Sequence, residues 1–176
     1  MIKIVVANMF DFPSRFLLIG SNFRGHCEKP TSLVSQVLPY FDSESLADYD
    51  RRTKEVQKLG TGWTYRLKEG SPFSLVHVGY PGTGHQPSFE KMLFGFFTDV
   101  DTICLRGGDS DITMPLVGTS FGDLSLEDWA ESFNRVAKDY IELNTYTWID
   151  TVTIVCTSQE RKEFIDKKIY PSCFTT

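Results

Sequence analysis

The stretch MPLVGTSFGDLSLEDW, from Met114 to Trp129, contains the transition that decides the fold. It begins apolar, becomes small and polar at Gly118, and leads through Ser125 into a helical pattern. A plain connection needs only about two to six residues. Two glycines and two hydroxyl side chains between a strand and a helix are typical of loops that hold a phosphate or another anion.

The residues after this stretch have the pattern of a helix, a strand and a helix. Ser125 and Asp128 have the spacing of a helix-capping box. Apolar side chains then recur every three or four positions from Leu126 to Ile141, which predicts an amphipathic helix. The continuous apolar run at residues 151–156 predicts a buried strand, and residues 159–169 predict a closing helix.

The rest of the chain alternates between the two patterns. Strands are predicted at residues 2–7, 15–21, 62–67, 73–79 and 111–117, with the third and fourth as neighbours. Helices are predicted at residues 31–38, at residues 43–59 before Gly60, and from a cap at Ser88 to Gly107 and Gly108. This order predicts an α/β fold, a three-layer α/β/α sandwich around a mixed, largely parallel central sheet. Ligands of such sheets bind at the carboxyl ends of strands, here after residues 7, 21, 117 and 156.

Composition narrows the classes of function. The 176 residues are 41% hydrophobic and 23% charged, which predicts a single domain over residues 1–176. The net charge of −5 argues against a nucleic-acid partner. No run approaches the roughly 20 apolar residues of a membrane span, and no signal peptide is recognisable, so a cytoplasmic protein is expected. Four scattered cysteines without a CxxC pair argue against a metal site and favour buried thiols in a reducing compartment.

The segment PLVGTSFGDLSLEDW, with its helix and the TVTIVC strand behind it, resembles the C-terminal half of a macro domain. The chain looks like a divergent bacterial or phage member. In that family a loop similar to P-x-x-G-T-G-x-x-G wraps the diphosphate of ADP-ribose. The resemblance implies that the diphosphate contacts Gly118, Thr119, Ser120, Phe121 and Gly122, with a serine at position 120 where the family favours glycine.

The N-terminal half resembles the same family more loosely. IVVANMF is similar to the family's first strand and G-D-I turn, with Ala7 and Asn8 in place of glycine and aspartate. The family's aspartate accepts a hydrogen bond from the adenine amino group, a role open to the Asn8 carbonyl oxygen. LLIGSNFRGHCEKPTSLVSQVL corresponds to an asparagine-containing strand end and loop. The resemblance places Ser21, Asn22 and Gly25 near the distal ribose and Arg24 beside the pocket.

These positions predict a pocket that binds ADP-ribose or a related nucleotide metabolite without a cofactor. Whether it also hydrolyses an ADP-ribose linkage stays open, because hydrolytic members carry a run of glycines where this chain has only Gly20 and Gly25. If hydrolysis occurs, Asn22 would position a water, and His26 or Glu28 would act as the base. Of the other histidines, His77 is predicted to be structural, and His85 lies in a loop that can reach a ligand.

Two alternatives belong to other classes of protein. One is a non-catalytic interaction module that binds an ADP-ribosylated protein or another protein partner. The other is a sensor or sequestering protein for a modified ADP-ribose signal.

Overall fold

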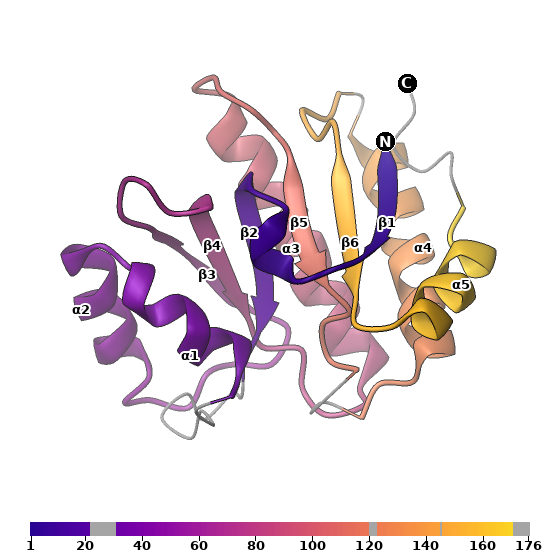
Figure 1. Cartoon of the computed structure of the whole chain (residues 1–176), viewed down its shortest axis with the longest axis horizontal. Helices are drawn as coiled ribbons and strands as arrows, with labels where there is room; N and C mark the ends of the chain where they lie inside the picture. The colour runs from indigo at the N-terminus through magenta and orange to yellow at the C-terminus, as the bar shows by residue number, and fades with distance from the viewer. Residues whose placement is uncertain (22–30, 120–122, 145, 171–176) are drawn as a thin grey trace.

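A computed structural model describes residues 1–21, 31–119, 123–144 and 146–170. Within these ranges six strands form one sheet in the order β1-β6-β5-β2-β4-β3 (Figure 1). Every neighbouring pair is parallel except β3 and β4, which are neighbours as the sequence predicts and pair antiparallel. The strands are β1 (Ile2–Val6), β2 (Ser14–Gly20), β3 (Gly62–Arg66), β4 (Phe73–Gly79), β5 (Ile112–Pro115) and β6 (Val152–Cys156).

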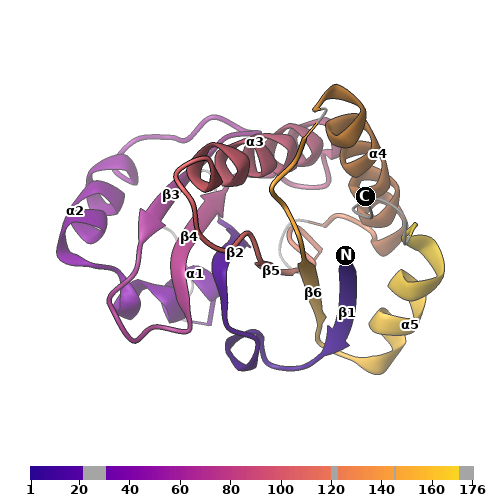
Figure 2. The same cartoon turned by 90° about the horizontal axis from the view of Figure 1, so that it is seen from above.

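Helices cover both faces of this sheet. Figure 2 shows α3 and α4 on one face, α1 on the other, α2 beside β3 and α5 beside the edge strand β1. The three-layer α/β/α arrangement is therefore confirmed. The helices are α1 (Leu33–Val37), α2 (Ser43–Arg52), α3 (Gln86–Cys104), α4 (Leu126–Leu143) and α5 (Gln159–Lys168), with short 3-10 turns η1 (Met9–Asp11) and η2 (Leu38–Tyr40). Among the described residues, no helix is long and apolar enough to cross a membrane.

Strand β2 shows why the central strands are continuously apolar. Phe16 and Leu18 pack in the core beneath α3 and α4. Leu17 and Ile19 point to the opposite face and pack in the core beneath α1. Successive side chains of a strand alternate between faces, so a strand covered on both sides needs apolar residues at every position.

The core between α3 and α4 is rich in aromatic side chains. Trp129 stacks on Phe133 with ring centroids 5.2 Å apart, and Phe97 meets Phe133 edge to face. All three side chains are fully buried or nearly so. The apolar stripe of α4 therefore fixes the helix against the sheet, and these rings pack in the core.

Helix α2 is shorter than the sequence predicts, because it ends at Arg52 and not near Leu59. The side chain of Gln57 turns inward and donates to the Glu55 carbonyl oxygen (3.1 Å). Its Oε1 accepts from Trp63 Nε1 at 3.0 Å. These bonds direct residues 53–61 toward β3, so tertiary contacts end a helix that the charged pattern alone would continue.

Helix α3 begins earlier than predicted. Its cap is His85, whose Nδ1 accepts from the Ser88 backbone N–H at 3.2 Å. Ser88 lies inside the first turn, and its own hydroxyl bonds to the same ring nitrogen at 2.7 Å. The histidine that the sequence offered as a ligand contact is thus the helix cap. The cap predicted for α4 is confirmed, since Ser125 Oγ accepts from Asp128 N at 3.0 Å.

Candidate functional site

Five parallel strands end along one edge of the sheet, at the bottom of Figure 1. In the register, Val6 of β1 lies opposite Cys156 of β6, and Gly20 of β2 lies opposite Gly79 of β4. Strand β5 ends between them at Pro115. The loops that follow these strands therefore meet at a common edge, which is where ligands of parallel sheets bind.

The loop after β5 begins with a tight turn. The Thr119 backbone N–H donates to the Leu116 carbonyl oxygen at 3.2 Å. Gly118 is the third residue of this turn and has φ of +84°. A four-residue turn with a positive φ at its third position favours glycine there, because glycine adopts this conformation without a steric penalty. The glycine predicted to cradle an anion is therefore required by the backbone.

The far end of the same loop is also held in place. The Leu124 N–H donates to the Gly118 carbonyl oxygen at 3.0 Å, which joins the two ends across residues 118–124. Asp123 has φ of +54°, an uncommon conformation outside glycine. Leu124 is buried, and Ser125 then caps α4. The frame of the predicted phosphate loop is thus fixed by hydrogen bonds and packing before any ligand binds.

Strand β2 ends directly against this frame. A Cβ built on Gly20 would lie 2.7 Å from Val117 Cγ1, a distance that real Cβ atoms do not show. The Ser21 backbone N–H extends the ladder and donates to the Gly79 carbonyl oxygen at 2.8 Å. Position 20 must therefore be glycine for the loops after β2 and β5 to approach one another. Ser21, predicted near the distal ribose, lies at this junction.

Helix α5 contributes a cation to the site that the sequence did not single out. Arg161 Nη1 donates to the Thr119 hydroxyl at 3.2 Å. Arg161 is in the first turn of α5, where its backbone N–H donates to the capping Ser158 Oγ at 3.3 Å. The Thr119 hydroxyl in turn donates to the Leu116 carbonyl oxygen at 2.8 Å. The guanidinium group therefore lies against the predicted phosphate loop.

Asn8 lies just after β1 and is exposed. Its side-chain oxygen caps η1 by accepting from the Phe10 N–H at 3.0 Å. This bond uses one lone pair of the oxygen and leaves the second open to another donor. The cap fixes the orientation of the amide and therefore the direction from which an adenine amino group would donate to its oxygen. The adenine contact itself stays a prediction.

The other predicted contacts lie outside the described residues. They are Asn22, Arg24, Gly25, His26 and Glu28 after β2, and Ser120, Phe121 and Gly122 after β5. The structure therefore brings together Gly118, Thr119 and Ser21 along the sheet edge, with Asn8 after the edge strand β1, which β6 separates from β5.

Two cysteines and one histidine, all reactive types of side chain, are buried in the protein interior. Cys104 and Cys156 are buried free thiols, and burial raises the pKa of each above its ordinary value. His77 is 3% exposed, and its Nδ1 lies 2.9 Å from the Thr64 hydroxyl. No group of His, Cys, Asp and Glu among the described residues could hold a metal ion.

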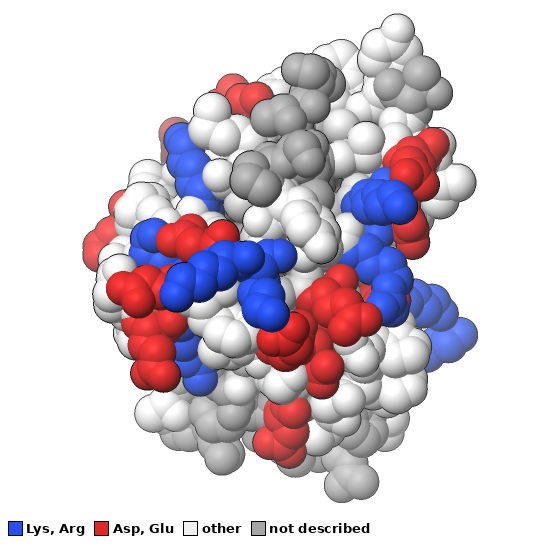
Figure 3. Space-filling view, turned by 90° about the vertical axis from the view of Figure 1, so that its right-hand side faces the viewer, with Lys and Arg blue, Asp and Glu red and all other residues white. Residues whose placement is uncertain are grey.

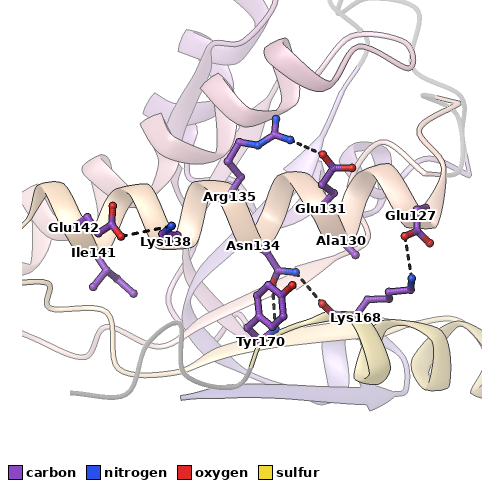
Figure 4. Close-up of a pocket in the computed structure, with 10 residues that line it drawn as sticks. All are labelled: Glu127, Ala130, Glu131, Asn134, Arg135, Lys138, Ile141, Glu142, Lys168 and Tyr170. Atoms are coloured by element: carbon purple, nitrogen blue, oxygen red, sulfur yellow. Dashed lines mark hydrogen bonds and ion pairs between the residues drawn. The ribbon is translucent and has the colours of Figure 1, made fainter.

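A groove of about 610 Å³ lies on a different surface, between α4 and the end of α5 (Figure 4). Its charged side chains are paired, with Lys168 on Glu127 at 2.9 Å and Arg135 on Glu131 at 2.5 Å. Figure 3 shows the same interleaving of acidic and basic residues across this face. None of the predicted site residues lines the groove.

Comparison with solved structures identifies the fold as that of macrodomains. The Trypanosoma brucei macrodomain in complex with ADP-ribose superposes with a TM-score of 0.74 at 12% identity, covering 94% of this chain and 68% of that one. An Oceanobacillus iheyensis macrodomain variant with ADPR gives 0.72 at 14% identity, covering 94% and 89%. The macrodomain of Mycobacterium tuberculosis DarG gives 0.63 at 14% identity, covering 88% and 97%. No protein-family model and no curated protein sequence matches this chain.

Proposed function

We propose that this chain binds ADP-ribose or a related nucleotide metabolite at the carboxyl edge of its sheet. The observation that carries the proposal is the turn at Gly118 and Thr119, which places a glycine-dependent loop where parallel strands end. Chains of the same fold have been solved with ADP-ribose and with ADP, which supports this class of ligand. The diphosphate would lie on residues 118–122, with Asn8 toward the adenine.

The loop after β2 would complete the pocket on the distal side. In this proposal Ser21, Asn22 and Gly25 lie near the distal ribose, and Arg24 pairs with an acidic group of the ligand. The close approach of Gly20 to Val117 supports this arrangement, because it brings the base of the loop after β2 to the predicted phosphate loop. An ADP-ribosylated protein would present the same group at its surface and could enter the same site.

The experiment compares ligand binding by two glycine variants with the same backbone requirement. Gly118→Glu places a carboxylate in the phosphate loop, whereas Gly70→Glu places one in an exposed turn with φ of +85° and open space around it. Thermal unfolding is measured with ADP-ribose, ATP and buffer. Ligand at about 100 times its Kd stabilises by roughly 2.7 kcal/mol, or about 5–10 °C for a chain of this size.

The expected result is a shift with ADP-ribose, larger than with ATP, for the wild type and for Gly70→Glu. Gly118→Glu should show none, because its carboxylate repels the diphosphate. If the wild type shows no shift with ADP-ribose at millimolar concentration, ordinary ADP-ribose binding is refuted. A modified ADP-ribose signal or a protein partner then becomes the leading alternative.

Hydrolysis of an ADP-ribose linkage is the catalytic extension of this proposal. Asn22 would position the attacking water, and His26 would accept its proton. The test incubates an ADP-ribosylated protein with the wild type, Asn22→Ala and His26→Ala, and measures released ADP-ribose. Release that both variants abolish supports catalysis. Tight binding without release identifies a binding module.

A further inference from the structure

Arg161 stands at the predicted phosphate loop and forms no ion pair with a carboxylate of the described residues. Among the described residues, seven other lysines and arginines form ion pairs with carboxylates, and Arg161 is in none of these pairs. Its neighbour Lys162 pairs with Asp166 of the same helix. The contact of Arg161 is the neutral hydroxyl of Thr119 at 3.2 Å. In a chain of net charge −5, a half-buried arginine whose side-chain hydrogen bond within the described residues goes to a neutral hydroxyl is unusual.

The position of Arg161 in its helix strengthens this observation. The N-terminus of a helix carries a partial positive charge, which favours acidic residues and disfavours basic ones in the first turn. Arg161 is the third residue of α5 and lies three positions after the cap at Ser158. Its positive charge therefore lies in the first turn, where the helix dipole disfavours it. A phosphate group beside it would interact favourably with both the guanidinium and the helix dipole.

The strand order shows which part of a nucleotide this cation would meet. Strand β6 lies between β1 and β5, and Arg161 follows β6. Because the Arg161 side chain reaches Thr119 from the β1 side of β5, its guanidinium group lies on the side of the turn at Gly118 and Thr119 that faces the end of β1, which Asn8 follows. A ligand with its adenine near Asn8 and its diphosphate on the turn would place its adenosine-linked phosphate nearest Arg161.

We propose that Arg161 is a specificity-determining residue that binds the adenosine-linked phosphate of the ligand. This inference rests on the proposed function and adds a side-chain cation to the turn at Gly118 and Thr119. Arginine has five N–H donors in a planar fork, and the contact with Thr119 uses one of them. The remaining donors can form a bidentate contact with phosphate oxygens. The site would then select nucleotides over nucleosides.

The test measures the affinities of ADP-ribose, AMP and adenosine by calorimetry for the wild type, Arg161→Gln and Arg106→Gln. Arg106 is a matched control, because it is an exposed arginine after α3, away from the carboxyl edge of the sheet, with no ion pair among the described residues. Arg161→Gln should weaken both ADP-ribose and AMP by about 10- to 100-fold, as expected for a lost charge-assisted hydrogen bond. Adenosine binding should be unchanged, and Arg106→Gln should match the wild type.

Salt dependence separates a direct phosphate contact from a purely structural role. The wild-type Kd for AMP should rise with ionic strength, and this dependence should become smaller in Arg161→Gln. Equal losses for AMP and adenosine would show that Arg161 only shapes the loop and would overturn the inference. Wild-type affinity of Arg161→Gln for ADP-ribose would overturn it while leaving the proposed function intact. Absence of ADP-ribose binding by the wild type would remove both.

Discussion

Replacing Gly118 by alanine tests the geometry of the turn separately from its charge. A Cβ at this position meets Leu124 at 3.8 Å and Pro81 at 3.9 Å, which are ordinary van der Waals distances. The φ of +84° is the unfavourable feature, since alanine in the left-handed region costs roughly 1–2 kcal/mol. The lower entropy of the unfolded alanine chain offsets about 0.4–1 kcal/mol of this. The expected net loss of unfolding free energy is about 1 kcal/mol.

Gly70→Ala is the matched control for this substitution. Gly70 has φ of +85° with no atom within 4 Å of the added Cβ, so its backbone strain is the same. Both variants should unfold about 2–4 °C below the wild type in a thermal melt. Only Gly118→Ala should weaken ADP-ribose, by about tenfold, because relief of its strain moves the N–H groups that would face the diphosphate.

Two outcomes would refute this reasoning. A loss at Gly118 more than about 3 kcal/mol greater than the loss at Gly70 would mean that the added methyl group has no room, contrary to the measured distances. Equal ADP-ribose affinity in both variants and the wild type would mean that the turn does not touch the ligand.

Two further predictions concern stability. Asp42 caps α2 by accepting from Ser45 N at 2.7 Å, and this hydrogen bond lowers the pKa of its carboxyl group, so Asp42→Ala should lose about 1 kcal/mol at neutral pH in denaturant titration. Because the pKa of Asp42 is lower in the folded than in the unfolded protein, the stability advantage of the wild type over Asp42→Asn should be full above about pH 4. It should disappear as the pH falls through the folded pKa. A constant difference in stability at every pH would contradict this assignment of the cap. The hydroxyl of the buried Tyr140 side chain donates to Asp101 Oδ2 at 2.5 Å and lies 3.0 Å from the Phe97 carbonyl oxygen, so Tyr140→Phe should lose about 1.5–3 kcal/mol by the same titration. Tyr146→Phe, at a side chain 88% exposed, should lose nothing, and equal losses would contradict the role of burial.

The strands were predictable because burial on both faces leaves a local signature. The runs at β2 and β6 are apolar at successive positions, and their short length between polar turns favours strands over buried helices. Helix limits were less predictable. The end of α2 depends on the inward turn of Gln57 toward Trp63, and the start of α3 depends on a histidine acting as a cap. These contacts involve residues whose intrinsic preferences do not mark a helix boundary.

The site was predictable where it depends on the backbone. Glycine at position 118 follows from the turn, and its place after a buried strand is visible in the sequence. Arg161 was not found, because its contact joins α5 to a loop 42 residues away. One local signal was present: an arginine in the first turn of a helix, where the helix dipole disfavours a cation. That signal becomes informative only when the fold brings the turn beside Thr119.

Charge pairing explains why the groove on α4 and α5 is a weaker candidate for the anionic ligand. Lysines and arginines line it, but Lys168 already pairs with Glu127, and Arg135 pairs with both Glu90 and Glu131. A phosphate entering there would have to replace one carboxylate by another anion and leave the displaced carboxylate nearby, so the net gain is small. At the phosphate loop, a phosphate would bind Arg161 beside the neutral Thr119 hydroxyl or in its place, and no described carboxylate would be displaced. The ligand is therefore expected beside Arg161, which pairs with no described carboxylate, and not in the groove on α4 and α5.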